Sequence, residues 1–321
     1  MTEMNAAVVT SFDEPPHYRR FPVPEPSAPE HVLVDVLAVG LHPRVRTDAA
    51  GRHYTSSGRL PMIPGIDAVG QRPDGRRIYF VATDEVIGTM AEKALVDVRR
   101  AIELPEGSDV RRVAAAMNPA MSSWIGLRRR VPIEPGQSVL VLGATGNAGT
   151  MAVQVARRLG AGRVVGAGRD PGRLTALRSL GADAVVPLTD PEAAGQALAA
   201  EAADVDIVID YLWGPPAEQV MGSLLRARAD RSKPVNWIQI GAVAGPTLEL
   251  PSVFLRSANL RLQGSGQGSV SPETYLAELA PLVEEINAGS ISVKTDAKTL
   301  ADVEAIWQQA DRPGERTVLV P

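Results

Sequence analysis

The feature that most constrains the fold begins near residue 138, where short apolar runs alternate with segments of helical spacing. Asp170-Pro171 and Asp190-Pro191 predict two helix starts, because aspartate caps free backbone amides and proline fits the first helical position. Strands that alternate with helices at this spacing predict an α/β fold built on a doubly wound parallel sheet. The predicted strands are Ser138–Gly143, Arg163–Gly168, Ala184–Leu188, Asp206–Tyr211 and Trp237–Ile240.

The first third of the chain has a different pattern. His31–Gly40 alternates with period two over its first half, as in a half-buried strand, and Pro73-Asp74-Gly75 predicts a hairpin turn. The tail Arg316–Val320 predicts an edge strand that is too short to form a domain by itself. We therefore expect a β-rich domain over residues 1–117, completed by residues 262–321, and a parallel-sheet domain over residues 118–261.

The charge balance restricts the class of partner. The chain has 33 Lys and Arg residues against 37 Asp and Glu residues, which argues against a nucleic-acid binder or a polybasic membrane binder. Residues 1–18 lack the basic start and apolar core of a signal peptide, and the apolar stretches are too short to cross a bilayer. We therefore expect a cytoplasmic protein that acts on a small molecule, with neither nucleic acid nor membrane as a partner.

The strongest chemical signal is the loop Gly143–Gly149, GATGNAG, which follows a predicted buried strand and opens a predicted helix. This arrangement points backbone N–H groups and the positive helix end toward a phosphate, as in dinucleotide-binding loops. Because Ala144 replaces the first glycine of the usual fingerprint, a purely structural tight turn is the alternative. The candidate cofactor-binding residues here are Ala144, Thr145, Gly146, Asn147 and Ala148.

The end of the second predicted strand indicates which dinucleotide is bound. NAD-binding sheets usually place an acidic residue there to bind the ribose hydroxyls, whereas this chain has Gly168-Arg169. A small residue leaves room for a 2′-phosphate, and Arg169, assisted by Arg173, can pair with it. The alternative is that Asp170 binds an unphosphorylated ribose while Arg169 is merely exposed. Because Asp170 already has a predicted capping role, we favour NADPH.

Several short motifs together resemble the medium-chain dehydrogenase/reductase superfamily, and within it the zinc-free quinone oxidoreductase branch. They are Pro64–Gly70, which is similar to the family's P-G-x-E-x-x-G turn, Gly88–Lys93, Pro105–Gly107, Ala114–Leu127 and Ala144–Gly149. The resemblance runs essentially end to end. It implies a GroES-like β-rich catalytic domain, a Rossmann domain, an active-site cleft between them, and a homodimer.

The chain contains no cysteine, which excludes thiolate zinc sites, iron–sulfur clusters and cysteine nucleophiles. The alcohol dehydrogenase branch of the superfamily binds catalytic zinc through Cys, His and Cys. At those places the resemblance puts His42, Ile66 and Asn118, and one imidazole, one alkyl chain and one carboxamide cannot form a zinc site. The cysteine-rich lobe for a structural zinc is missing as well. We therefore expect no metal.

Without a metal to polarise a carbonyl oxygen, acceptors that delocalise the incoming charge are favoured, such as a quinone or an alkene conjugated to a carbonyl. The candidates for proton donation and charge stabilisation are His42, His53 and Tyr54. Quinone reductases usually have Asn-Pro where this chain has His42-Pro43, and Tyr54 comes one residue later than in their pattern. Quinone specificity therefore stays open, and surface or packing roles are the alternative for all three side chains.

The resemblance implies further site residues. Asn118, Ser122, Gly241, Ala242, Gly264 and Ser265 are the remaining candidates for contact with the nicotinamide half of the cofactor, and Trp124, Tyr211, Trp213 and Phe254 for the wall of the substrate pocket. Only 4% of the residues are aromatic, so large rings near strand ends stand out, although core packing is the commoner role.

Together these observations predict a zinc-independent, NADPH-dependent oxidoreductase that transfers hydride to a quinone or an activated alkene. Two alternatives stay open. One is an enoyl or enone reductase of a biosynthetic pathway, which shares the same machinery. The other is an NADPH-binding redox sensor without turnover.

Overall fold

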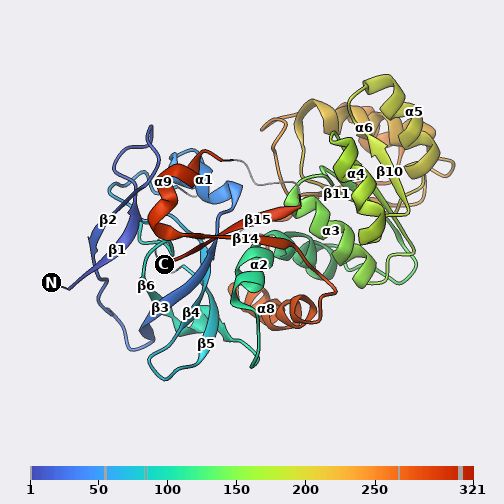
Figure 1. Ribbon diagram of the computed structural model, residues 1–321. Coiled ribbons are helices and arrows are strands. Elements are labelled where there is room, and N and C mark those ends of the chain that lie inside the picture. Colours follow the sequence, from blue (N-terminus) through green and yellow to red (C-terminus); the bar gives the residue numbers. More distant parts are fainter. Residues whose placement is uncertain (1, 54–55, 83, 85, 267, 310–313) are drawn as a thin grey trace. The chain divides into compact units, whose positions relative to one another are not determined.

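The computed structural model of the protein describes residues 2–53, 56–82, 84, 86–266, 268–309 and 314–321. The chain divides into two compact units, which are described separately (Figure 1). The β-rich unit comprises Met1–Asn118 and Pro272–Pro321, and the parallel-sheet unit comprises Pro119–Ser271. The division falls within helix α2 (Val110–Ile125).

The parallel-sheet unit contains, in its described part, a six-stranded parallel sheet with the order β10-β9-β8-β11-β12-β13. In chain order this is 3-2-1-4-5-6, the order of a doubly wound dinucleotide-binding sheet, and the direction of winding reverses between β8 and β11. The strands are β8 (Ser138–Leu142), β9 (Arg163–Gly168), β10 (Ala184–Pro187), β11 (Ile207–Asp210), β12 (Val235–Gln239) and β13 (Leu260–Gly264). The helices are α3 (Asn147–Arg158), α4 (Pro171–Leu177), α5 (Pro191–Ala202), α6 (Gly214–Ala227) and α7 (Ser252–Ser257), with the π-helix η2 (Gly126–Arg130) and the 3-10 helix η3 (Arg178–Leu180).

The apolar runs form strands here because a parallel sheet is covered by helices and its strands are buried on both faces. Val139, Leu140, Val141 and Leu142 of β8 are all 0% exposed. The side chains of Asp170 and Asp190 accept backbone N–H groups in the first turns of α4 and α5, so the two predicted caps are confirmed.

The β-rich unit contains a sheet with the order β14-β15-β3-β4-β5-β7, to which β6 adds by pairing with β3, and a separate hairpin of β1 and β2. The predicted turn at Gly75 joins the antiparallel strands β4 and β5. The strands are β1 (Glu3–Val8), β2 (His17–Pro22), β3 (His31–Gly40), β4 (Asp67–Gln71), β5 (Arg77–Val81), β6 (Lys93–Asp97), β7 (Ala101–Glu103), β14 (Lys294–Thr299) and β15 (Glu315–Val320). The helices are α1 (Pro43–Ala49), α8 (Pro272–Asn287) and α9 (Val303–Trp307), with the short turns η1 (Val98–Arg100) and η4 (Leu300–Asp302).

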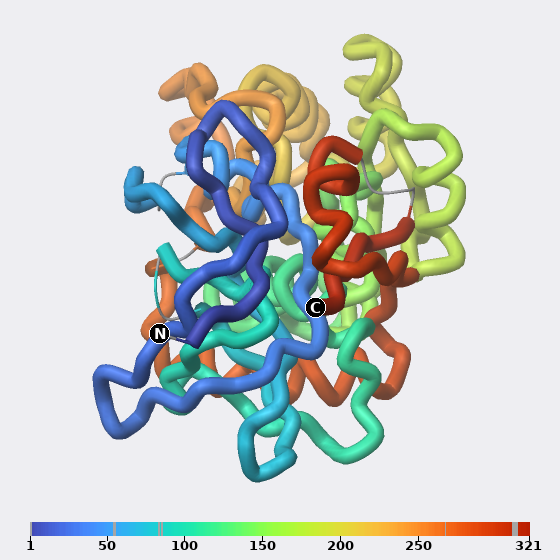
Figure 2. The backbone as a smooth tube through the Cα atoms, turned by 60° about the vertical axis from the view of Figure 1, so that its left-hand side comes forward, coloured from blue at the N-terminus to red at the C-terminus, as the bar shows by residue number. Residues whose placement is uncertain are grey.

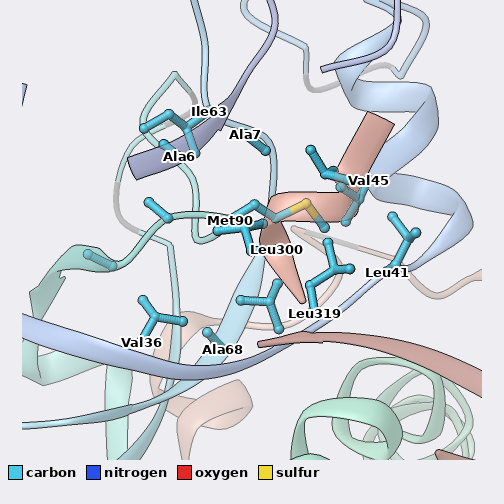
Figure 3. Packing of buried hydrophobic residues seen from close by; sticks show 14 of the residues in the cluster. Ala6, Ala7, Val36, Leu41, Val45, Ile63, Ala68, Met90, Leu300 and Leu319 are labelled. Carbon is cyan, nitrogen blue, oxygen red and sulfur yellow. The ribbon is translucent and has the colours of Figure 1, made fainter. Parts of the chain in front are cut away.

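The C-terminal strand β15 lies between β14 and β3, so the predicted edge position is wrong. Val318 and Leu319 are 0% exposed, because the strand crosses the core of the unit instead of bordering it. Leu319 belongs to the same apolar cluster as Leu41, Met90 and Leu300 (Figure 3). The C-terminal segment thus runs beside N-terminal strands, as the red and blue parts of the tube in Figure 2 show, and both ends of the chain build one core.

The parallel-sheet unit ends at Ser271, later than the boundary at residue 261 expected from the sequence. The reason is β13, which pairs in parallel with β12 from Leu260 to Gly264 and adds a sixth strand to the sheet. A strand this short, followed by a glycine-rich loop, does not show from its sequence which sheet it joins.

The longest helices in the described ranges, α2 and α8, have 16 residues each. A membrane-spanning helix needs about 20 apolar residues. No helix of the described residues is long and apolar enough to cross a membrane. A cytoplasmic location stays a prediction.

Asp97 connects β6 to the turn η1 and is 6% exposed. Its carboxylate accepts the side-chain N–H groups of Arg99, at 2.9 Å from Nε and 2.6 Å from Nη2, and also the backbone N–H of that residue at 2.9 Å. The bonds from the guanidinium are the main reason that the pKa of Asp97 falls to about 2, and they outweigh the opposing effect of burial.

We expect Asp97→Asn to lower the free energy of unfolding at pH 7 by about 1–2 kcal/mol, a figure reduced because the Arg99 side chain is 66% exposed. Because the folded-state pKa lies below the unfolded value, the contribution is complete above about pH 5 and is lost as the pH falls toward 2. Chemical denaturation at pH 7 and pH 3 measures this, and the gap between native and variant protein should shrink by about half. Asp35→Asn, which removes an exposed ion pair with Lys93, is the matched control and should cost under about 0.5 kcal/mol. An equal gap at both pH values would contradict the assignment.

Candidate active site

The predicted glycine loop connects β8 to α3 at the strand end where the winding reverses. Gly146 is the N-cap of α3 in extended backbone and offers no side-chain acceptor, and the first turn of the helix contains no acidic residue. Within the loop, the Gly146 N–H donates to the Gly143 carbonyl at 3.0 Å, and Thr150 Oγ1 donates to the Ala144 carbonyl at 3.1 Å. A helix N-terminus without a competing carboxylate is an anion site, so the loop residues, which include Asn147 and Ala148 at the helix start, fit the pyrophosphate of a dinucleotide.

Two predicted cofactor residues, Gly168 at the end of β9 and Arg173 of α4, lie beside Thr145 of this loop. Arg173 Nη1 donates to the carbonyl of Thr145 at 2.8 Å. A methyl group added at Gly168 would lie 2.6 Å from the Thr145 side chain, well inside van der Waals contact. Packing against Thr145 therefore requires a glycine at this position, a reason that the sequence did not reveal.

Arg169 and Asp170 follow directly after β9. Arg169 is exposed. The Oδ1 atom of Asp170 accepts the backbone N–H of Arg173 at 2.9 Å, and its Oδ2 atom lies 3.9 Å from Arg173 Nε. The Asp170 carboxylate is thus engaged with the first turn of α4, while the guanidinium groups of Arg169 and Arg173 give this strand end a positive charge.

A buried aspartate that the sequence analysis missed organises the end of β11. Asp210 is 0% exposed, and it accepts hydrogen bonds from the indole Nε1 of Trp237 at 3.0 Å and from the backbone N–H groups of Leu212 at 2.8 Å and Trp213 at 3.0 Å. Burial raises the pKa of Asp210, and these donors oppose that rise. The turn holds Trp213 at a φ of 53°, a conformation that costs a residue other than glycine about 1–3 kcal/mol. The sequence offers one signal for this site, because Asp210 is an acidic residue at the end of the apolar run that forms β11.

Tyr211 and Ser122, predicted on separate grounds, are in direct contact. The Tyr211 hydroxyl lies 2.8 Å from Ser122 Oγ. Burial raises the pKa of Tyr211 to about 12, opposed by hydrogen bonds with Ser122 and Ser123, so the phenol keeps its proton at neutral pH. Gly241 lies beside it and donates its N–H to the Asp210 carbonyl at 3.1 Å, with Ala242 next along the chain.

The remaining predicted residues of this unit fall into two groups. Gly264 ends β13 and Ser265 follows it, and Arg130 Nε donates to the Gly264 carbonyl at 3.1 Å. Trp124 is 3% exposed and stacks with the guanidinium of Arg128 at 4.9 Å. The other two pocket candidates, Trp213 and Phe254, are partly buried against the apolar core of the parallel-sheet unit.

In the β-rich unit, the predicted residues His42 and Asn118 meet at a third residue, Asp67. The His42 ring is 2% exposed and its Nε2 atom lies 3.5 Å from Asp67 Oδ1. Asn118 Nδ2 donates to the same oxygen at 3.3 Å. Asp67 is 1% exposed and begins β4, directly after the Pro64–Ile66 turn. The sequence analysis included Asp67 in a turn motif but assigned it no role at the site.

Two tyrosines complete this polar cluster, and the sequence analysis missed both. The Tyr79 hydroxyl donates to Asp67 Oδ2 at 2.8 Å, and burial together with the Asp67 charge raises the pKa of Tyr79 well above its usual value. Burial also raises the pKa of Tyr275 on α8, and the charge of Asp67 adds to that rise while Arg44 opposes it. No local pattern links residues 67, 79 and 275, so only the tertiary structure could bring them together.

The other two predicted catalytic residues are placed differently. Burial lowers the pKa of His53, and the charge of Arg44 lowers it further while Asp48 opposes both. A lowered pKa makes the protonated form of His53 scarcer at neutral pH, which disfavours His53 as a proton donor. Tyr54 lies outside the described residues.

The donor set of the cluster does not fit a zinc ion. Ile66 presents an alkyl chain and packs against the apolar core, and Asn118 turns its amide N–H toward Asp67. That leaves one imidazole and one carboxylate, whereas a catalytic zinc takes three protein ligands. In the parts of the chain that the structure describes, no group of three or more His, Cys, Asp and Glu side chains is arranged to hold a metal.

Comparison with known proteins places the chain in a family. The family model described as zinc-binding dehydrogenase matches residues 148–285. A protein of Emericella nidulans named as a probable NADPH-dependent quinone reductase is 33% identical over 99% of this chain and 100% of its own length. A 2-methylene-furan-3-one reductase of Solanum lycopersicum is 28% identical over 50% of this chain and 45% of its own length.

Among solved structures, the quinone oxidoreductase of Thermus thermophilus, studied also in complex with NADPH, superposes with a TM-score of 0.78 at 25% identity. The match covers 99% of this chain and all of that one. With the end-to-end relative, the shared fold and a loop that fits a dinucleotide, the chain belongs to the medium-chain dehydrogenase/reductase superfamily, in its quinone oxidoreductase-like branch, and is an oxidoreductase with a nicotinamide cofactor.

Proposed function

We propose that this protein uses NADPH, without zinc, to reduce a quinone or an alkene conjugated to a carbonyl group. The observation that carries the proposal is the donor set at Asp67, where one imidazole and one carboxylate stand in place of three zinc ligands. Without a Lewis acid, acceptors that spread the incoming charge over a conjugated system are the most reactive. The names of two relatives support both acceptor classes, since 2-methylene-furan-3-one is an alkene conjugated to a ketone.

The chain's own residues have distinct roles in this proposal. The nicotinamide, when bound, supplies a hydride. The loop Ala144–Ala148 and the start of α3 bind the pyrophosphate, and the Tyr211–Ser122 pair, with Gly241, Ala242, Gly264 and Ser265, is proposed to contact the nicotinamide half. His42 is the proposed proton donor, because burial and the charge of Arg44 disfavour the protonated form of His53.

The choice of NADPH rests on charge at the end of β9. A 2′-phosphate carries negative charge that Arg169 and Arg173 can neutralise with charge-assisted hydrogen bonds. The carboxylate that could instead bind an unphosphorylated ribose, Asp170, is engaged in capping α4. Both observations favour the phosphorylated cofactor.

The direct test measures loss of NADPH absorbance with a panel of small quinones, enones and enoyl thioesters, before and after dialysis against a chelator, alongside elemental analysis for zinc. We expect turnover with at least one conjugated acceptor, no stoichiometric zinc, and no change on chelation. Preference for enoyl thioesters would identify a biosynthetic enoyl reductase. Loss of activity on chelation, restored by zinc, would overturn the metal-free assignment.

Arg169→Ala should weaken NADPH binding by about 10–100-fold and NADH binding by less than about threefold, because a charge-assisted bond to phosphate contributes about 1.5–3 kcal/mol. Calorimetric titration of each cofactor measures the two dissociation constants. Arg178→Ala is the matched control, because it removes an exposed arginine just after α4 whose Nη1 donates to the Asp183 carbonyl. Equal losses for NADPH and NADH would refute the role of Arg169.

We also propose a homodimer formed along β13, the last strand in its sheet order. Val253 and Leu255 on the adjoining helix α7 are 50% and 49% exposed, and an apolar surface beside a sheet edge favours pairing with a second copy. Light scattering should give twice the mass of one chain, and the double variant Val253→Glu, Leu255→Glu should give one chain mass. Val98→Glu, at an exposed apolar side chain of the other unit, should leave the dimer intact. A single-chain mass for the native protein would refute this proposal.

A further inference from the structure

The buried carboxylate of Asp67 needs a compensating charge. An ionised carboxylate that is 1% exposed has lost nearly all of its hydration, which costs several kcal/mol unless a cation and hydrogen bonds replace the water. Tyr79 and Asn118 supply neutral donors. The cation-forming side chain paired with Asp67 is His42, at 3.5 Å.

The His42 ring is held in a fixed place. It follows β3, and a methyl group added at Gly40 would lie 2.6 Å from its Cε1 and Nε2 atoms, so the ring packs directly over this glycine. Asn118 shares Asp67 Oδ1 with the ring, and Tyr79 occupies Oδ2. Hydrogen bonds from Tyr79 of β5 and Asn118 of α2 thus orient the carboxylate, and the His42 ring lies beside it.

Other charged and titratable groups around the cluster come from four further elements. Arg44 of α1 and Arg100 of η1 both act electrostatically on Tyr275 of α8, and so does the charge of Asp67. Arg316 of β15 donates from Nη1 to the carbonyl of Leu41, the residue before His42. These cations oppose protonation of the ring, so the charge of Asp67 is what favours an imidazolium.

We propose that Asp67 is a positioning residue that keeps His42 protonated, and that this imidazolium gives the proton that completes reduction of a carbonyl-conjugated alkene. This rests on the proposed function. The acceptor gains two electrons and one hydrogen as hydride from NADPH, which becomes NADP⁺, and one proton from the His42 ring. The His42 ring loses that proton, the C–H or O–H bond of the product forms, and the neutral imidazole regains a proton from water.

This assignment separates the two acceptor classes. After hydride arrives, a quinone becomes a hydroquinone anion, whose phenol-type group has a pKa of about 10 and which can leave and take its proton from water. A conjugated alkene becomes an enolate, a far stronger base that reverts unless a proton is supplied in place. The His42–Asp67 pair therefore matters for alkene reduction and much less for quinone reduction.

The first test does not depend on activity. Heteronuclear NMR of the protein labelled at its four histidines follows the protonation of each ring with pH, and His42→Gln assigns the His42 signal. In the Asp67→Asn protein, the midpoint of the His42 titration should lie at least about one pH unit lower than in the native protein. Asp67→Glu, which keeps the charge, should restore it. Asp13→Asn, an exposed aspartate of the same unit, is the matched control and should move nothing.

The second test compares kcat/KM for a quinone and for a conjugated enone over pH. Asp67→Asn should lower the enone value by about 100-fold, the quinone value by less than about threefold, and shift the alkaline limb of the enone profile to lower pH. Asp67→Glu should return the alkaline limb of the enone profile to its native pH, and His42→Gln should abolish that limb.

The outcomes distinguish this inference from the proposed function. An unchanged His42 titration in the Asp67→Asn protein, or equal losses for quinone and enone with an unshifted profile, would show that Asp67 is only structural. A different result is that the native protein fails to oxidise NADPH with every acceptor tested, while the His42 titration shifts as expected. That result would overturn the proposed reaction and leave the pairing of His42 with Asp67 intact.

Discussion

Buried carboxylates must collect hydrogen-bond donors, and this requirement shapes both units of the protein. Asp67 gathers Tyr79, Asn118 and His42 in the β-rich unit, and Asp210 gathers the Trp237 indole and two backbone N–H groups in the parallel-sheet unit. A charge removed from water is costly, so the donors are held in fixed geometry around it. Asp67 is the first residue of β4, and Asp210 is the last residue of β11.

The parallel sheet explains why the residues proposed to bind the cofactor converge. Parallel strands carry their carboxyl ends to one edge, and a dinucleotide binds where the winding reverses, here between β8 and β11. The glycine loop leaves β8 at that edge, Arg173 lies over the loop, and Tyr211 follows β11. Residues far apart in the chain thus form one surface because of strand order alone.

The two units contribute different kinds of chemistry to a single oxidoreductase. The parallel-sheet unit offers backbone amides and arginines, which suit a phosphorylated cofactor. The β-rich unit offers a buried imidazole–carboxylate pair, His42 and Asp67, with too few further donors for a catalytic zinc. In the metal-free reaction proposed above, the acceptor class depends on whether the reduced product needs a proton supplied in place.

The sequence by itself determined the strand–helix alternation, the caps at Asp170 and Asp190, and the glycine loop, because these depend on periodicity and on contacts within a few residues. Only the tertiary structure decided that β15 lies inside its sheet, that β13 joins the other one, and that Asp67 binds Asn118 across 51 residues of chain. The physical reason is that burial and charge pairing are set by long-range packing. A local pattern shows which residues can carry a charge, but not which donors the fold places around it.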